Sequence, residues 1–249
     1  MEEKDKKEFK FKFFLPAGEC NPEREMPVTL LVERLIEVAT LAANTWGVGY
    51  ATLIEHNEGW VLSRLTTEMK RYPRVNEHYS ISTWIDGVNS HYSQRCFEIC
   101  GEQGQVIGYA RSIWMIINFA DRRAADLSAI GSMTSKVLSK PCPIAQQSRV
   151  RISQPTQECS YTFKYCDCDV NRHVNTVRYV ELLLNQLPLE QYEQSQLSRL
   201  ELTFMRESRY GDEVKVQVQQ EGTRYLMTID DEQSSRIKAL LVFEPREND

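Results

Sequence analysis

A dense group of polar side chains lies in the segment DCDVNRHVNTVRYVELLLNQLP, which runs from Asp167 to Pro188. Asp169, Asn171 and His173 occupy every second position just before an apolar run with helical spacing. Any one of them is best explained as a helix cap, because Asp and Asn accept hydrogen bonds from the first amides of a helix. Their alternation with other residues predicts an extended lead-in that points all three side chains to one side. A functional cluster explains three such groups better than capping does.

The helix that follows adds a chemical reason for such a cluster. The first amides of a helix have no intrahelical partner, and they can stabilise a carbonyl oxygen that gains negative charge during acyl transfer. Histidine side chains exchange protons near neutral pH, so His173 is suited to proton transfer. Asn171 can orient a carbonyl or a water molecule. Asp169 can orient Asn171 or the helix start, or it can activate water.

A second candidate carboxylate is Glu207, near the end of a strand predicted over residues 197–206. A glutamate flanked by Arg206 and Arg209 is usually part of a solvated ion pair, and for Glu207 alone we favour that interpretation. Beside Asp169, Asn171 and His173, a carboxylate at an adjoining strand end becomes a candidate base for water activation.

Other patterns give weaker signals. Cys166 and Cys168 followed by His173 lack a second Cys or Cys/His pair at a ligand spacing, which disfavours a metal site. The sequence holds no G-x-S-x-G and no phosphate-binding or dinucleotide-binding glycine pattern. We therefore expect neither a metal nor a cofactor.

Composition narrows the class of protein. The chain has 249 residues, a net charge of −5 and seven cysteines. The charge disfavours wholesale nucleic-acid binding, and the odd cysteine count favours free thiols in a reducing compartment. No apolar run is long enough to span a membrane, and the N-terminus resembles neither a secretory nor a transit signal. We expect a cytoplasmic protein.

Basic residues gather around the polar connector that separates the two halves of the chain. They are either ordinary solvated charges or a docking patch for an acidic protein. The residues concerned are Arg122, Arg123, Lys136, Lys140, Arg149 and Arg151.

The same order of elements is predicted twice. In the first half, a strand over residues 8–15 precedes a helix capped by Thr29 and ended by Gly47. Strands are then predicted at 50–55, 60–72, 79–88, 91–100 and 105–118. In the second half, a strand at 161–165 precedes a helix at 175–187, and strands follow at 197–206, 213–221, 223–230 and 235–244. Two long helices, each wrapped by an antiparallel sheet, would pack as a pseudo-dimer.

Four blocks in the right order give the chain a family resemblance. DVNRHVNTVRY (169–179) resembles the D-x-N-x-H-x-N-N-x-K-Y signature of the acyl-acyl carrier protein thioesterases, and FMRESRYGDEV (204–214) resembles their Y-R-R-E-C-x-x-D-x-V. LTTEMKRYPRVNEHYSISTWI (65–85) and ARSIWMIINFADRRAADL (110–127) resemble stretches of the same family's first half. The resemblance covers nearly the whole chain, and the absence of a transit-like segment favours the bacterial branch.

The resemblance implies an α+β fold of two tandem hotdog units and hydrolysis of the thioester between a fatty acyl chain and acyl carrier protein. It implies that Asp169, Asn171, His173 and Glu207 are catalytic. Ser208 stands where plant relatives commonly have cysteine, which disfavours a thiolate nucleophile there. We expect units at residues 1–140 and 161–249 with a linker at 141–160, no membrane span, and leave a homodimer open.

The first unit lacks an equivalent of the Asp-Asn-His set, so we expect one active site per chain, in the second unit. The first unit would then hold the acyl chain, through Met69, Trp84, Trp114 and Met115. Three alternatives stay open: a hotdog thioesterase that acts on coenzyme A esters, a non-catalytic acyl- or lipid-binding module, and a hydroxyacyl dehydratase. The dehydratase usually pairs one His with one acid, so Asp169 and Asn171 argue against it.

Overall fold

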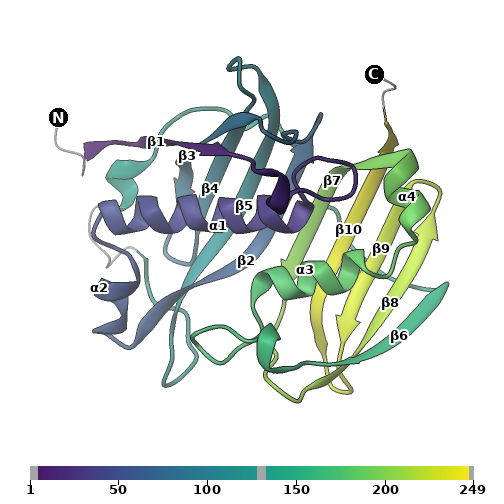
Figure 1. Cartoon of the computed structure of the whole chain (residues 1–249). Coiled ribbons are helices and arrows are strands. Elements are labelled where there is room, and N and C mark those ends of the chain that lie inside the picture. Colours follow the sequence, from purple (N-terminus) through teal and green to yellow (C-terminus); the bar gives the residue numbers. More distant parts are fainter. Residues whose placement is uncertain (1–4, 128–132, 247–249) are drawn as a thin grey trace. The chain divides into compact units, whose positions relative to one another are not determined.

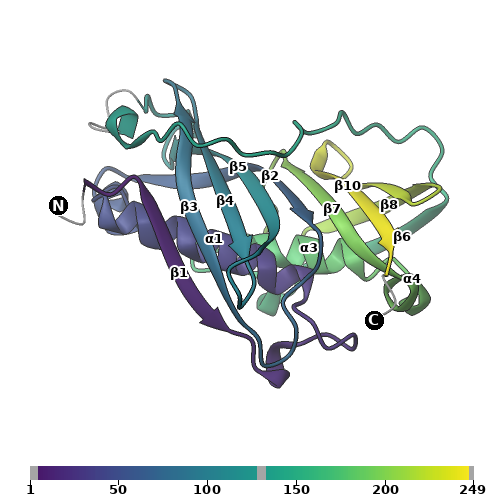
Figure 2. The same ribbon diagram turned by 90° about the horizontal axis from the view of Figure 1, so that it is seen from above.

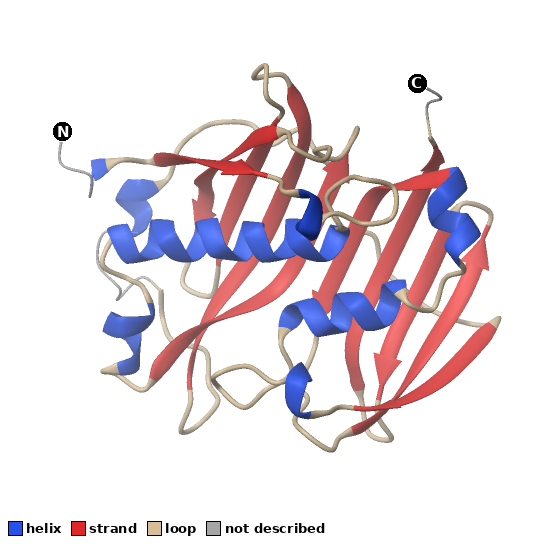
Figure 3. Ribbon diagram, viewed as in Figure 1, coloured by secondary structure: helices blue, strands red, loops and turns tan. Residues whose placement is uncertain are grey.

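The chain forms two compact units, Met1–Ala145 and Gln146–Asp249, called here the first and second unit. The computed structural model describes residues 5–127 and 133–246. Each unit combines an antiparallel sheet with a helix that crosses one face of it (Figure 1). Figure 3 shows the helices and strands of each unit in separate colours. This architecture is the hotdog fold, and the prediction of two such units in tandem is confirmed.

The first unit is built on helix α1 (Val28–Thr45) and five strands in the order β1-β3-β4-β5-β2. The strands are β1 (Glu8–Phe14), β2 (Glu58–Met69), β3 (His78–Val88), β4 (Ser93–Cys100) and β5 (Val106–Asn118). Short helices at α2 (Tyr50–Ile54), η2 (Ala17–Glu19) and η3 (Met133–Lys136) complete the unit. Figure 2 shows α1 on one side of the strands of its own unit.

Helix α1 forms because its apolar residues recur at helical spacing and it contains neither glycine nor proline. Leu31, Leu35, Val38 and Ala42 are all buried, which is the pattern of a helix with one apolar face toward a sheet. The helix begins after Pro27 rather than at a Thr29 cap. It ends before Gly47, whose φ of 77° is the left-handed conformation that glycine adopts easily at a helix end.

The second unit has a shorter central helix, α3 (Thr176–Leu184), and strands in the order β7-β10-β9-β8-β6. The strands are β6 (Gln157–Thr162), β7 (Ser195–Phe204), β8 (Glu213–Glu221), β9 (Arg224–Asp230) and β10 (Ser235–Pro245). The helical turn η4 (Tyr165–Asp167) precedes α3, and α4 (Leu189–Gln194) follows it. Tyr179, Val180 and Leu183 form the buried side of α3.

Three local predictions were wrong. Residues 50–55 were expected as a strand but form α2, because a short apolar run does not distinguish the two structures. The predicted helix 175–187 ends at Leu184, and after Pro188 the chain starts a separate helix, α4. The predicted strand 161–165 lies earlier, at Gln157–Thr162.

In residues 5–127 and 133–246, no helix has the length and apolar character needed to cross a membrane.

Candidate active site

The segment before α3 is a tight turn rather than the extended lead-in that the alternation predicted. Asp169 Oδ1 accepts hydrogen bonds from the amides of Asn171 (2.8 Å) and His173 (3.2 Å). The Asp169 amide in turn donates to the His173 carbonyl at 2.8 Å, and Arg172 takes a left-handed φ of 62°. The Asp169 carboxylate therefore shapes the backbone that carries His173, whereas Asn171 is exposed at the tip of the turn.

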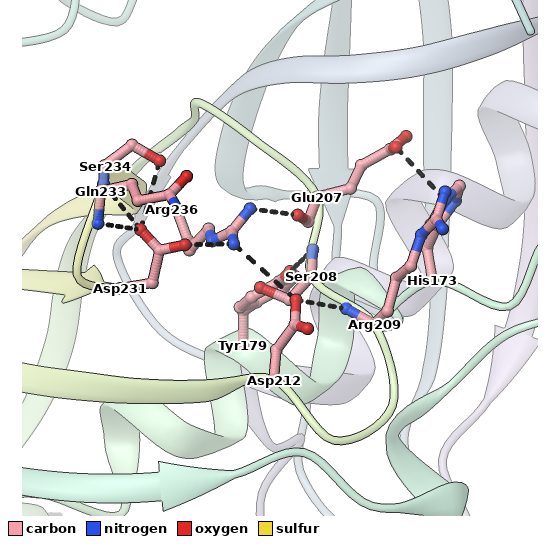
Figure 4. Close-up of polar contacts among 10 residues, drawn as sticks. All are labelled: His173, Tyr179, Glu207, Ser208, Arg209, Asp212, Asp231, Gln233, Ser234 and Arg236. Atoms are coloured by element: carbon pink, nitrogen blue, oxygen red, sulfur yellow. Dashed lines mark hydrogen bonds and ion pairs between the residues drawn. The ribbon is translucent and has the colours of Figure 1, made fainter.

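His173 and Glu207 lie side by side (Figure 4). His173 Nε2 is 3.4 Å from Glu207 Oε2, and the two side chains are 15% and 30% exposed. Backbone contacts produce this approach, because the Val174 amide donates to the Ser208 carbonyl at 2.8 Å and His173 forms a bridge with Arg209. An imidazole and a carboxylate at this separation, partly shielded from water, form a pair that can exchange a proton.

Arg236, on β10, holds the backbone of Glu207. Arg236 Nη1 donates to the Glu207 carbonyl at 2.6 Å, and Nη2 contacts Asp231 and lies 3.8 Å from Asp212. The amide of Ser234 donates to Asp231 and, with further help from Arg236, holds the pKa of that carboxyl below its usual range. Arg236 is 8% exposed, so an ion-paired and nearly buried cation holds the backbone carbonyl of Glu207.

The sequence did not single out Arg236. The only local signal is a cation between Ser235 and Ile237 at the start of an otherwise apolar strand. That pattern does not predict a contact between Arg236 and Glu207, because the two residues are brought together only by the tertiary fold.

The start of α3 is capped by Asn175. Its Oδ1 accepts the Val177 amide at 2.9 Å, and the Arg178 amide donates to the Asn175 carbonyl at 3.0 Å. Both of those amides are therefore engaged within the helix start. Thr176 is the first helical residue, and its amide has no intrahelical carbonyl to bond. Of the first three amides of α3, the Thr176 amide is therefore the one with no acceptor inside the helix start.

Tyr179 connects α3 to the residue after Glu207. Its hydroxyl accepts the Ser208 amide at 2.8 Å, and burial raises the pKa of the phenol. Ser208 itself is fully buried. The Ser208 side chain is therefore buried, and Tyr179, the last residue of the quoted signature, holds the Ser208 backbone amide.

The first unit contains a small cavity between α1 and the sheet, with a volume of about 40 Å³. Its walls include Ala39, Ala43, Trp60, Ser93, Arg95 and Trp114. Of the four residues predicted to contact an acyl chain, Trp114 lines this cavity.

Strand register separates the other three from Trp114. Trp84 pairs with Cys96, one residue from the Ile85–Arg95 pair, so Trp84 faces the side of the sheet opposite to the cavity. There it packs against Cys142 and Ile144.

Met115 follows Trp114 directly and so also faces away from the cavity. Met69 pairs with Gly108, on the same face as Trp114 but six residues along β5, roughly 20 Å by the rise of a strand. A Cβ at Gly108 would lie 2.2 Å from Met69 Sδ, so Met69 packs over this glycine. Trp84, Met69 and Met115 therefore do not line this cavity.

The six basic residues of the predicted docking patch differ in their environments. Arg122 and Arg123 are exposed in the turn after β5. Lys136 is buried, and Lys140 is engaged by Glu8 at 2.8 Å and by the ring of Trp84 at 4.4 Å. In the second unit, Arg149 and Arg151 are exposed. Of these six residues, Arg122 and Arg123 are the two first-unit residues whose side chains are exposed.

Comparison with known proteins identifies the class of hotdog protein to which this fold and site belong. The acyl-ACP thioesterase N-terminal domain matches residues 6–129, and the acyl-ACP thioesterase C-terminal domain matches residues 151–241. The chain belongs to the acyl-ACP thioesterase family.

Individual relatives agree with this assignment. A crystal structure of an acyl-ACP thioesterase from Bacteroides thetaiotaomicron is 31% identical with a TM-score of 0.90, over 98% of this chain and 100% of that one. The 12:0-ACP thioesterase of Umbellularia californica, 19% identical, shares the fold with a TM-score of 0.85, over 96% of this chain and 98% of that one. The palmitoyl-acyl carrier protein thioesterase of Gossypium hirsutum is 26% identical over 80% of this chain. The chain spans about half the length of such curated plant relatives, 52% in that case.

Proposed function

We propose that this chain hydrolyses the thioester of fatty acyl-acyl carrier protein and releases a free fatty acid and the carrier-protein thiol. The observation that carries the proposal is the contact of His173 with Glu207, 3.4 Å apart beside the start of α3. Membership of the acyl-ACP thioesterase family supports the choice of substrate.

The chemistry balances without a further reactant. Glu207, with His173 beside it, accepts a proton from water while the water oxygen bonds to the thioester carbon. The carbonyl oxygen becomes an oxyanion, whose stabilisation we assign to the Thr176 amide and the Asn171 side chain. The C–S bond then breaks, and the leaving thiolate takes up the proton held by the His173–Glu207 pair. Asp169 fixes the turn that carries Asn171 and His173.

The test is thiol release from a panel of acyl carrier proteins that bear different acyl chains. We expect Glu207→Gln and His173→Ala each to lower kcat by about 10²–10⁴-fold, the usual contribution of a positioned acid or base. Glu193→Gln, an exposed carboxylate on α4, serves as the matched control and should retain full activity. Full activity in both His173→Ala and Asn171→Ala would refute the site.

The same panel separates the proposal from its alternatives. Faster turnover of matched coenzyme A esters would assign the chain to the coenzyme A thioesterases. Acyl-chain binding without thiol release, unaffected by Glu207→Gln, would show a non-catalytic binding module.

A further inference from the structure

Two cysteine side chains meet on the outer face of the first unit's sheet, the face opposite to α1. Cys96 on β4 pairs directly with Trp84 on β3, so both side chains project to that face. Cys142 belongs to residues 137–145, called here the outer segment. Cys96, Cys142, Trp84 and Ile144 pack together in one buried cluster. Both cysteines are free and buried, so the cluster contains two unoxidised thiols.

Hydrogen bonds hold the outer segment against the sheet. Trp84 Nε1 donates to the Lys140 carbonyl at 3.0 Å. Arg111 Nη2, from β5, donates to the Cys142 carbonyl at 3.0 Å. The backbone of Cys142 is therefore placed relative to β3 and β5 before any covalent bond joins it to the sheet.

The Cys142 sulfur lies beside Cys96. Its thiol donates to the Ala110 carbonyl at 3.6 Å, and Ala110 precedes Arg111, the residue that pairs with Cys96 between β4 and β5. The Cys96 thiol donates to the Cys142 sulfur, and this hydrogen bond lowers the pKa of Cys142 while it raises that of Cys96. Thiols already in contact need only a small shift to reach the S–S bond length of about 2 Å.

Only one layer of chain separates this pair of thiols from solvent. In the outer segment, Cys142 and Ile144 are buried, whereas Pro141 and Pro143 are exposed. Cys142 is 8% exposed and Cys96 is 0% exposed. Access and thiolate character together decide which cysteine reacts first, and both favour Cys142. A small oxidant such as hydrogen peroxide needs a much smaller opening here than a protein oxidant would.

We propose that Cys96 and Cys142 form a site of reversible oxidation by hydrogen peroxide, which joins the outer segment to β4 through a disulfide bond. The Cys142 thiolate attacks one peroxide oxygen, so an S–O bond forms and the O–O bond breaks. The released hydroxide takes up the proton that Cys142 lost and becomes water.

The Cys96 sulfur then attacks the Cys142 sulfenic acid, so the S–S bond forms and the S–O bond breaks. The hydroxide that leaves takes the Cys96 proton as a second water. Two thiols thereby lose two electrons, and one peroxide is reduced to two waters. A dithiol such as dithiothreitol reverses the change by thiol–disulfide exchange.

Peroxide treatment of the folded full chain, followed by alkylation, proteolysis without reduction and mass spectrometry, tests this assignment. We expect a cross-link between the Cys96 and Cys142 peptides, which dithiothreitol removes. The melting temperature should rise by roughly 4 °C or more on oxidation, because the disulfide closes a long loop. Cys142→Ser should lose both the cross-link and the rise. Cys100→Ser, which removes another buried thiol of β4, is the matched control and should keep both.

The proposal would be overturned by the absence of this cross-link in the folded chain, by another cysteine pair in its place, or by an unchanged melting temperature. An equal yield of the cross-link from chain unfolded in urea would also overturn it, because unfolding removes the packing that brings the thiols together. If Cys142→Ser does not fold, the cross-links of the unmodified chain still decide. None of these measurements involves thioester hydrolysis, so failure of this site and failure of the proposed catalytic function are distinguishable.

Discussion

At the scale of single residues, Asp169 acts on the backbone of its own turn. Its carboxylate accepts two amides, which is the bonding of an Asx turn and not of a general base poised over a substrate. Asn at this position can accept the same amides through its side-chain oxygen, although it cannot take up a proton as a carboxylate does.

This difference gives a direct prediction. Asp169→Asn should retain most of the kcat for acyl-carrier-protein hydrolysis, whereas Asp169→Ala should lower it about tenfold or more, because the turn loses both hydrogen bonds. Steady-state kinetics on the two variants and the unmodified chain provides the measurement. Equal losses in both variants would instead assign proton transfer to Asp169.

His173 and Glu207 should behave as one catalytic unit, since their side chains are in contact. We predict that the double variant His173→Ala/Glu207→Gln loses about as much kcat as the more damaged single variant, because residues that act together are non-additive. Kinetics on all four proteins of the cycle measures this. Fully additive losses would mean that the two groups act independently.

Much of the site at this scale could be predicted from sequence. Asp169, Asn171 and His173 stand in one continuous segment, so their types and spacing indicated both a possible cap and a cluster, whereas the residue that caps α3 is Asn175. The lead-in was mispredicted because an alternating pattern also fits a turn whose carboxylate folds back on its own amides. The contact between Ser208 and Tyr179 could not be predicted from the sequence, because this hydrogen bond joins residues 29 positions apart.

At the scale of elements, α3 depends on its cap. Asn175 satisfies the Val177 amide, and replacing an Asn cap by Ala costs about 1 kcal/mol. We predict that Asn175→Ala lowers the free energy of unfolding by about that amount, whereas Asn175→Asp does not, because Asp caps equally well. Urea unfolding followed by circular dichroism supplies both values. An unchanged midpoint in Asn175→Ala would show that tertiary contacts alone hold the helix start.

Arg236 links β10 to the active site through the Glu207 carbonyl. We predict that Arg236→Gln lowers kcat about tenfold or more with little change in KM, because the residue positions the base without facing substrate. Arg224→Gln, an exposed arginine on β9, is the control.

A purely structural role for Arg236 would lower the melting temperature and leave the kcat per folded molecule unchanged. Circular dichroism, which gives the folded fraction, and steady-state kinetics on the same samples separate the two outcomes, and Arg236→Lys should recover part of the lost activity.

The face of the sheet on which each strand residue lies could not be predicted from the sequence. β2 shifts register between Leu62 and Arg64, so parity counted along that strand fails at this point. Trp84 and Trp114 are both aromatic and both in strands, yet they face opposite sides of one sheet. Only the pairing with β4 shows this, through Cys96 for Trp84 and Ser93 for Trp114.

At the scale of the whole molecule, the chain has a net charge of −5. An acidic carrier protein, the partner proposed above, would therefore meet long-range repulsion, which a local basic site would have to offset. Arg122 and Arg123 are exposed. We predict that Arg122→Glu/Arg123→Glu raises KM for acyl carrier proteins by about tenfold and leaves that for coenzyme A esters nearly unchanged.

The measurement is a pair of Michaelis–Menten curves at low and physiological salt, because screening should shrink the difference. The double charge reversal Lys10→Glu/Arg224→Glu, at exposed positions on β1 and β9, controls for net charge. Equal effects on both substrate classes would remove Arg122 and Arg123 from the docking surface.

The Arg236 contact also limits where the chain can tolerate insertions and deletions. In the hairpin between β9 and β10, the Ser234 amide donates to Asp231, and Asp231 pairs with Arg236, which in turn donates to the Glu207 carbonyl. A residue inserted into the β9–β10 hairpin would shift the Arg236 guanidinium relative to Glu207. The turn between β4 and β5, at Gly101 and Gly104, belongs to the first unit, and within the described residues its backbone hydrogen bonds run between Gly101, Gly104 and Gln105. Among homologues, insertions are therefore expected to accumulate at the β4–β5 turn and to be purged from the β9–β10 hairpin.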